Sequence, residues 1–491
     1  MLRERQVEVE RKNTATGKRD NRIPILLSGG LFVILFIALI CNMGYFVSTN
    51  RQDMINNSYN SRQELLLSQN YRGSIYSRDG EILALSEVDV AQNETRVYPY
   101  KNLFSHIVGY STQGRTGVEA LANYYLINTN IRLSSKVAND MAGVKNPGDN
   151  VFTTLDVQLQ EIADAQLDIH QGAIIMTEVS TGRILAMVSH PDFDPNEISD
   201  IWDSLLQSET SSVLVNRATQ GLYPPGSTFK IVTALQYIRQ NQDVLDDYSF
   251  QCKGSFRVGE SRISCYHGMN HGTVDFVRSF AKSCNSSFAN IGMGLDREQF
   301  QETLGDLLFD SELPLALNYS GSHVRDMEEM EDWEMMQTSI GQGRTQITPI
   351  HLHMITSAIA NNGILMKPYV IDHVESAEGR VVKTFHPESY GSLMTEEEAA
   401  ILREMMTAVV ESGTATKLSG REYTAAGKTG SAEYNNVKGD SHAWFTGFAP
   451  AENPEVCVTV IVEGAGSGGD YAVPMARRLF DGYFKEKEAS Q

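Results

Sequence analysis

Ser227 and Lys230 are the pair of residues in this chain best suited to covalent chemistry. They end the run Tyr-Pro-Pro-Gly-Ser-Thr-Phe-Lys at 223–230, and apolar residues at helical spacing follow over 231–238. This pattern predicts a helix whose first turn holds the serine, so that both side chains share one face. A serine hydroxyl becomes a good nucleophile when a base takes its proton, and a lysine amine one turn away can be that base if its charge is suppressed. Alone, the two residues are weak evidence for catalysis and are better explained as a helix cap and a solvated charge.

Two later motifs change this balance. Ser-Cys-Asn occupies 283–285, and Lys-Thr-Gly-Ser occupies 428–431. In this order the three segments match the Ser-x-x-Lys, Ser-x-Asn and Lys-Thr-Gly set of penicillin-recognising serine enzymes. Each tripeptide or tetrapeptide is common alone, whereas the ordered triple is not. We therefore favour the enzymatic interpretation of all three.

The charge balance excludes one broad class of function. Among 491 residues, 61 are acidic and 41 are lysine or arginine, which gives a formal net charge of -20. A general nucleic-acid binder needs a basic surface to neutralise phosphates, and this composition does not provide one. The length allows two or three domains with a sizeable core.

An uncharged apolar stretch at 24–47 is long enough to cross a bilayer. More basic residues precede it than follow it over a similar distance, so the positive-inside rule places the tail 1–23 in the cytoplasm and the rest of the chain outside. The length of the run and the lack of a small-x-small site after it favour an uncleaved single-pass anchor in the cell membrane over a cleaved signal peptide.

The rest of the chain divides into two regions, 48–156 and 157–491. In the first, Asp79-Gly80 between two strand patterns predicts a hairpin, and a turn-rich segment at 146–150 marks the approach to a boundary. In the second, strand patterns at both ends surround a middle, 229–359, that is mostly helical in pattern. We therefore predict an α/β fold with one sheet packed by helices. The predicted strands of the second region are 172–179, 183–188, 422–433, 442–448 and 455–462.

Taken together, the chain resembles the class B penicillin-binding proteins, which are membrane-anchored, monofunctional peptidoglycan D,D-transpeptidases. The resemblance rests on the anchor, the three motifs, Arg-Gly-Ser-Ile at 72–75 and Gly-Val-Glu at 117–119. It implies a β-lactamase-like transpeptidase fold, namely an antiparallel sheet packed by helices with a helical subdomain, carried on a mixed α+β pedestal domain. It also implies stem peptides ending in D-Ala-D-Ala as substrates, β-lactams as inhibitors, and no cofactor or metal.

The first two motifs take defined roles by this resemblance. Ser227 would attack the penultimate D-Ala carbonyl, and Lys230 would be its base. Ser283 would relay a proton to the leaving amine, and Asn285 would hold Lys230 and the substrate amide. A neighbouring stem-peptide amine would then resolve the acyl-enzyme.

The third motif would bind the end of the substrate. Lys428 and Thr429 would hold the terminal carboxylate by charge and by hydroxyl. Gly430 would leave room for the peptide along the strand, as in strand addition. The backbone N–H groups of Ser227 and Ser431 would form the oxyanion hole.

The resemblance implies a partner and leaves alternatives open. Because no glycosyltransferase region is recognisable, strand polymerisation would come from a polytopic enzyme of the FtsW/RodA type. The resemblance favours wall synthesis at division, but the sequence does not separate septation, elongation and sporulation. A D,D-carboxypeptidase, a serine β-lactamase and a catalytically inactive β-lactam-binding scaffold remain as alternatives.

Cysteines outside the membrane pose a separate question. Cys252 and Cys265 flank a short loop and are consistent with a disulfide or with two free thiols. His267, His271 and Cys284 lie nearby, which makes a zinc site conceivable. The spacing lacks a close Cys-x-x-Cys pair, so the sequence does not predict a metal centre.

Overall fold

The computed structural model describes residues 22–56, 62–208, 211–433 and 441–489. The chain forms two units, 1–64 and 65–491. In the first, helix α2 (Arg22–Asn56) contains a stretch, Ile25–Phe46, long and apolar enough to cross a membrane, and no other such helix occurs among the described residues. Most of the predicted cytoplasmic tail, 1–21, lies outside the described residues.

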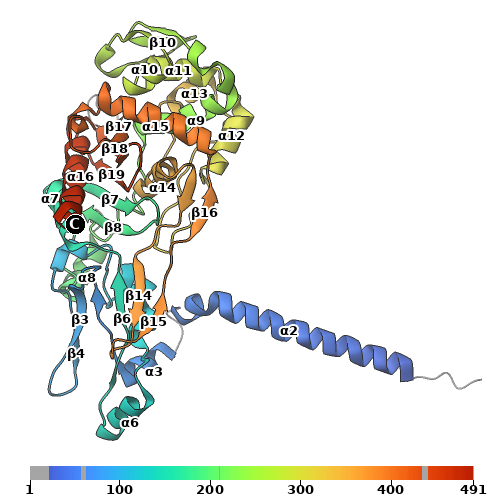
Figure 1. Ribbon diagram of the computed structural model, residues 1–491, viewed down its shortest axis with the longest axis vertical. Helices are drawn as coiled ribbons and strands as arrows, with labels where there is room; N and C mark the ends of the chain where they lie inside the picture. Colours follow the sequence, from blue (N-terminus) through green and yellow to red (C-terminus); the bar gives the residue numbers. More distant parts are fainter. Residues whose placement is uncertain (1–21, 57–61, 209–210, 434–440, 490–491) are drawn as a thin grey trace, which may run out of the picture. The chain divides into compact units, whose positions relative to one another are not determined.

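The second unit contains a six-stranded sheet in the order β15-β14-β6-β2-β3-β4 (Figure 1). Strands β2 and β3 form an antiparallel hairpin around Asp79-Gly80, as predicted. Strands β14 and β15 come from a much later part of the chain, and β14 pairs with β6 through His373 and Phe152. The first-region sheet therefore depends on residues far away in sequence. The strands are β2 (Ile75–Tyr76), β3 (Ile82–Val88), β4 (Glu94–Val97), β6 (Asn150–Thr153), β14 (Ile371–Glu375) and β15 (Val381–Thr384).

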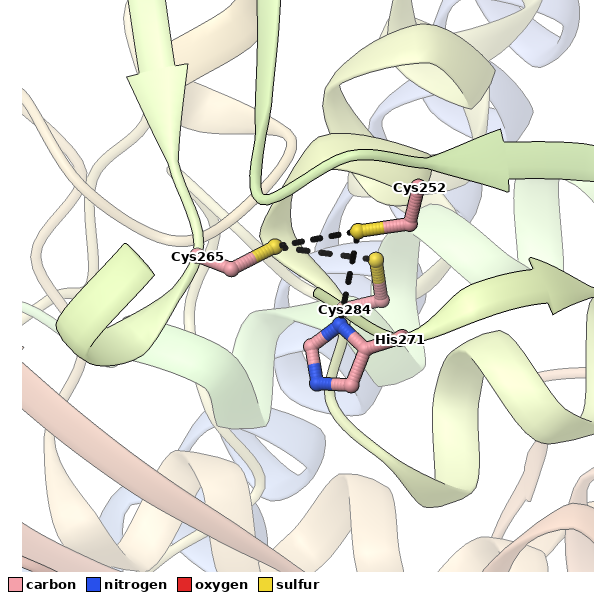
Figure 2. Close-up of side chains that lie close together, drawn as sticks. All are labelled: Cys252, Cys265, His271 and Cys284. Atoms are coloured by element: carbon pink, nitrogen blue, oxygen red, sulfur yellow. Dashed lines mark hydrogen bonds between the residues drawn. The ribbon is translucent and has the colours of Figure 1, made fainter. Parts of the chain in front are cut away.

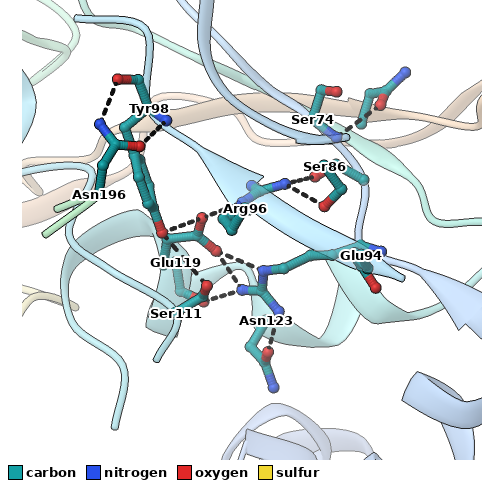
Figure 3. Close-up of polar contacts among 12 residues, drawn as sticks. Ser74, Ser86, Glu94, Arg96, Tyr98, Ser111, Glu119, Asn123 and Asn196 are labelled. Carbon is teal, nitrogen blue, oxygen red and sulfur yellow. Dashed lines mark hydrogen bonds and ion pairs between the residues drawn. The ribbon is translucent and has the colours of Figure 1, made fainter. Parts of the chain in front are cut away.

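A buried carboxylate joins this sheet to helix α4 (Gly117–Leu121). Glu119 accepts hydrogen bonds from Arg72 Nε at 2.6 Å, Arg96 Nε at 2.7 Å and the Tyr98 hydroxyl at 3.1 Å (Figure 3). Burial alone would raise the pKa of Glu119, but the two guanidinium charges and their hydrogen bonds outweigh it and hold this pKa below its usual value. The carboxylate therefore stays ionised as the centre of the network.

A second sheet has five antiparallel strands in the order β17-β18-β19-β7-β8. Strands β18, β19 and β8 are buried along their whole length, because helices cover both faces of the sheet. Helices α7 (Val157–Leu167) and α16 (Ala472–Ala489) pack together on one face, and α14 (Pro349–Ala360) packs on the other (Figure 1). This is the predicted α/β arrangement. The strands are β7 (Gly172–Glu178), β8 (Ile184–His190), β17 (Ala426–Glu433), β18 (Ser441–Ala449) and β19 (Val456–Val462).

The segment between β8 and β17 supplies the helical subdomain, together with strands that the sequence did not predict. Two short antiparallel ribbons, β9/β12 and β10/β11, lie beside helix α11. The helices are α9 (Lys230–Asn241), α10 (Phe276–Ala281), α11 (Asn285–Met293), α12 (Arg297–Asp306), α13 (Asp332–Thr338) and α15 (Glu396–Glu411). The ribbons are β9 (Phe250–Cys252), β10 (Ser255–Val258), β11 (Ser261–Ser264) and β12 (Gly272–Val274).

Candidate active site

The turn that carries Ser227 packs directly on strand β17. Gly226 has φ +54°, and a Cβ at this position would lie 2.8 Å from the Ser431 carbonyl oxygen. Only glycine satisfies both requirements at low cost. The sequence placed Ser227 in the first turn of an α-helix. In the structure it lies instead in a 3-10 turn, Gly226–Phe229, and α9 begins at Lys230.

Lys230 is the centre of the site and is fully buried. Its Nζ donates to Ser227 Oγ at 3.1 Å and to Asn285 Oδ1 at 2.7 Å, and it also reaches the carbonyl oxygen and Oγ of Ser283 at 2.8 and 3.1 Å. Burial lowers the pKa of Lys230 from 10.5 to about 7. A large share of the lysine is therefore a neutral amine near neutral pH, and a neutral amine can accept the serine proton.

Ser283 lies between the two helices that present the second motif. It follows α10 with φ +53°, a left-handed conformation that is uncommon for a residue with a side chain and that often marks functional sites. This conformation turns both its carbonyl and its hydroxyl toward Lys230. Asn285 then begins α11, and its Nδ2 donates to the Ser264 carbonyl at 3.1 Å, which fixes the amide oxygen toward the lysine.

Lys428 reaches the same serine from strand β17. Its Nζ donates to Ser283 Oγ at 3.0 Å and to the Thr429 carbonyl oxygen at 3.0 Å. Burial, and after it the charge of Lys230, hold the pKa of Lys428 well below its usual value. The Ser283 hydroxyl thus connects two buried amines, which is the geometry of a proton relay.

The other residues of the third motif continue along β17. The hydroxyls of Thr429 and Thr414 are hydrogen-bonded, and Ser431 Oγ accepts the Gly468 N–H at 3.4 Å. A Cβ on Gly430 would lie 3.0 Å from the Pro225 carbonyl oxygen and 3.0 Å from the Thr228 methyl group. The glycine therefore admits the nucleophile turn, a second requirement for glycine beside the space for substrate that the sequence predicted.

The structure brings all eight predicted residues to one place. Five polar side chains form one hydrogen-bonded set, and the remaining three residues lie next to it on β17. Sequence reasoning missed Thr414, whose hydroxyl orients Thr429. In the sequence, only the Ser-Gly-Thr run at 412–414 could have pointed to Thr414, and such runs are common in loops. The five connected residues are Ser227, Lys230, Ser283, Asn285 and Lys428.

A cluster of potential metal ligands lies beside the second motif. Cys252, Cys265, His271 and Cys284 converge, with their ligand atoms all within 4.8 Å of one another (Figure 2). His267, which the sequence grouped with them, is exposed and does not belong to this cluster.

Known proteins share both regions of this chain. Residues 172–481 match the penicillin binding protein transpeptidase domain, and residues 72–151 match the penicillin binding protein A dimerisation domain. The chain is 30% identical over 454 residues to the peptidoglycan D,D-transpeptidase PbpA of Mycolicibacterium smegmatis, with 86% of this chain and 91% of that protein covered.

Solved structures agree with this relationship. The D,D-transpeptidase domain of a peptidoglycan glycosyltransferase from Eggerthella lenta superposes with a TM-score of 0.77 at 28% identity, covering 85% of this chain and 99% of that chain. A ceftriaxone acyl-enzyme complex of penicillin-binding protein A from M. tuberculosis gives 0.77 at 27% identity, covering 86% and 99%. The three ordered motifs, the shared fold and the extent of these matches lead to one conclusion: this chain belongs to the class B penicillin-binding proteins.

Proposed function

We propose that Ser227 is the nucleophile with which this chain, a serine-type peptidoglycan D,D-transpeptidase of cell-wall synthesis, forms its acyl-enzyme. The observation that carries the proposal is the 3.1 Å contact between Ser227 Oγ and the buried Lys230 Nζ, whose pKa burial lowers to about 7. A hydroxyl and a partly neutral amine in direct contact are a nucleophile and its base.

The first half-reaction transfers one acyl group to the enzyme. Neutral Lys230 takes the Ser227 proton, and Oγ attacks the carbonyl carbon of the penultimate D-Ala. The tetrahedral intermediate then collapses, the amide C–N bond breaks, and the terminal D-Ala leaves with a proton on its amine. Ser283 Oγ lies 3.1 Å from Lys230 Nζ and 3.0 Å from Lys428 Nζ, which suits it to pass that proton. The product is an ester on Ser227.

The second half-reaction returns the serine. An amine from a neighbouring stem peptide attacks the ester carbonyl and gives up one proton to neutral Lys230. The C–O bond to Ser227 then breaks, and Lys230 passes this proton to Oγ. A new amide then crosslinks the two peptides. We propose the same chemistry for β-lactams, whose strained amide would acylate Ser227 in place of the D-Ala-D-Ala bond.

Strand β17 would hold the end of the substrate. We assign the terminal carboxylate to Lys428 and the Thr429 hydroxyl, because an arriving anion favours the charged form of a buried amine. Gly430 would let the peptide run beside the strand, and the N–H groups of Ser227 and Ser431 would bind the developing oxyanion. Loss of one oxyanion donor typically lowers the rate by about 100-fold or more.

Fluorescent penicillin labelling of the full-length protein tests the nucleophile. The Ser227→Ala variant is expected to lose covalent labelling completely, and the wild-type protein to label and release the adduct slowly. Ser412→Ala, which removes an exposed hydroxyl directly after α15, is the matched control and should label normally. Labelling of a folded Ser227→Ala protein would refute the assignment. Fast release from the wild type would instead favour the β-lactamase alternative.

We also propose how the chain is organised. Residues 1–23 would be cytoplasmic, 24–47 would span the membrane, and 48–156 would form the pedestal, whose sheet is extended by β14 and β15. Residues 157–491, apart from these two strands, would form the transpeptidase domain outside the membrane. The single apolar stretch in α2 supports the anchor. Fusions of alkaline phosphatase and of green fluorescent protein to the C-terminus test the orientation, since only the phosphatase fusion should be active.

A membrane polymerase of the FtsW/RodA type is the partner that we propose for strand synthesis, contacted through the anchor and the pedestal. The support is chemical: a crosslinking enzyme needs nascent glycan strands close to its site. Co-purification of the full chain under gentle detergent extraction tests the pairing. Recovery of this chain alone from cells that contain the polymerase would count against it.

A further inference from the structure

Three cysteines and one histidine from four separate segments within 252–284 meet beside the second motif (Figure 2). Cys252 ends strand β9, Cys265 follows β11, His271 precedes β12, and Cys284 caps the start of α11. The three sulfur atoms are buried, and the half-buried imidazole closes the group on its outer side. All four residues lie outside the hydrogen-bonded set that surrounds Lys230.

Three of the six distances between ligand atoms in this group match the edges of a zinc tetrahedron, and all six are within 4.8 Å. Cys265 Sγ lies 3.7 Å from Cys252 Sγ and 3.7 Å from Cys284 Sγ, and His271 Nδ1 lies 3.5 Å from Cys252 Sγ. Ideal tetrahedral zinc, with bonds of about 2.3 Å to sulfur and 2.0–2.1 Å to nitrogen, gives edges of about 3.8 Å between sulfurs and about 3.6 Å between sulfur and nitrogen. A disulfide would need two sulfur atoms about 2.05 Å apart. One disulfide among these three cysteines would also leave the third cysteine as a free thiol.

Backbone groups around the sulfurs are arranged for thiolates. Cys252 Sγ accepts the Gly254 N–H at 3.4 Å, Cys265 Sγ accepts the Ser286 N–H at 3.5 Å, and Cys284 Sγ accepts the Ser287 N–H at 3.4 Å. One N–H for each sulfur is the kind of outer-shell contact that orients metal ligands and disperses their negative charge.

We propose that Cys252, Cys265, His271 and Cys284 bind one Zn²⁺ in a closed structural site. Three thiolates and one imidazole in a tetrahedron suit this ion, and four protein ligands leave no open position for a substrate or water. The metal would therefore support the structure and would not take part in the reaction.

The site would position the second motif. Cys284 lies between Ser283 and Asn285, the two residues whose oxygens hold Lys230. The three buried cysteines form a small core of their own, against which Phe250 packs, so the ribbons have few other apolar anchors. Zinc would tie both ribbons to the start of α11 and fix the strained Ser283 backbone. This consequence rests on the proposed function, whereas the metal site itself does not.

Metal analysis of the full-length protein, purified in detergent without chelating resin, tests the site. We expect about one zinc per chain in the wild type and in Cys457→Ser, which changes a buried cysteine elsewhere in the core. Cys252→Ser and His271→Ala should lose the zinc, and His271→Cys should keep it as a four-sulfur site. Wild-type protein without zinc would overturn the proposal, as would full zinc in His271→Ala.

Thiol titration of unreduced, denatured wild-type protein separates zinc from a disulfide. The chain has five cysteines. Zinc ligation predicts five reactive thiols, with zinc released as they are modified, whereas a disulfide between Cys252 and Cys265 predicts three. A count of three would overturn the site without touching the assignment of Ser227.

Zinc removal from folded wild-type protein tests the positioning role. A strong chelator should slow acylation by penicillin at least tenfold, and added Zn²⁺ should restore the rate while the circular dichroism spectrum stays the same. The Ser227→Ala variant should still bind zinc. A failed positioning role can therefore be distinguished from a wrongly assigned nucleophile. An unchanged acylation rate in protein shown to have lost its zinc would overturn the positioning role.

Discussion

Two buried clusters of charged groups in this chain have opposite designs. In the region that matches the dimerisation domain, 72–151, which we propose as part of the pedestal, the Glu119 carboxylate forms ion pairs with Arg72 and Arg96. Figure 3 shows Glu119 and Arg96 within this network. At the candidate site, Lys230 and Lys428 share one serine, and their hydrogen-bond acceptors are hydroxyl, amide and carbonyl oxygens. Opposite charges keep the first cluster ionised, whereas burial lowers the pKa of both lysines and the charge of Lys230 lowers the pKa of Lys428 further.

The comparison shows that the free-energy cost of burying a charged group has a different consequence in each cluster. An ionised group in the interior is stable only with a partner of opposite charge, and the pedestal provides two. A lysine without such a partner loses its proton more readily, which is what a base for Ser227 requires. The pedestal cluster therefore serves structure, and the lysine cluster serves reactivity.

Lys230→Arg should break the second cluster with the largest effect. Arginine stays charged at any working pH and cannot accept the serine proton. We expect acylation by penicillin to slow by about a thousandfold or more, within the range that general bases contribute. The measurement is the second-order acylation rate of folded protein, with Lys367→Arg, at a half-exposed lysine, as control. A rate within tenfold of the wild type would contradict the assigned base.

Glu119→Gln should break the first cluster and affect stability instead. Leaving two arginines without their buried carboxylate is expected to cost about 3–5 kcal/mol. Denaturant unfolding measures this loss, and the acylation rate per folded molecule should not change. Glu388→Gln, which removes an exposed partner of Lys367, is the control and should cost less than about 1 kcal/mol. Equal losses for the two variants would contradict the comparison.

A pH series should separate the clusters without any substitution. Acylation needs neutral Lys230, so its rate should rise about tenfold per pH unit below about 7 and level off above. Glu119 has a lowered pKa when folded, so its contribution to stability is complete above its unfolded value of about 4.5 and is lost as the pH falls through the folded pKa. Activity should therefore fall at a pH where the pedestal remains stable. An acylation rate that is flat between pH 5.5 and 8 would contradict this account.

Thr414→Val should give the smallest effect on the acylation rate and tests whether Thr414 belongs to the site. The substitution removes the hydroxyl that is bonded to Thr429 and keeps the shape of the side chain. We expect acylation to slow by about three- to tenfold, the scale of one hydrogen bond of about 1 kcal/mol. Thr407→Val, whose hydroxyl bonds only within helix α15, is the control. A rate equal to that of the control would remove Thr414 from the site.

The predicted strands have local causes, whereas the predicted site does not. The strands around Met176 and Val460 were predicted because buried strands form continuous apolar runs. The meeting of Ser227, Ser283 and Lys428 followed from the order of three motifs and a family resemblance, since no local pattern specifies contacts between distant segments.

The remainder depends on tertiary pairing. Local periodicity could not predict that His373 would pair beside Phe152, because the two residues lie in different regions of the chain. The left-handed backbone of Ser283 follows from packing around Lys230, and the Cys252–His271 contact follows from two ribbons too short for strand patterns to detect. The contact of Gly430 with the nucleophile turn was not predicted, because it is visible only in three dimensions.

Peptide mapping of the penicillin-treated, full-length protein tests the central claim most directly. Trypsin cuts after Arg217 and Lys230, so Ser227 lies in the peptide 218–230. We predict that this peptide gains the mass of one intact penicillin and that fragmentation places the added mass on Ser227. An adduct on another residue, or a folded protein that forms no adduct, would contradict the account.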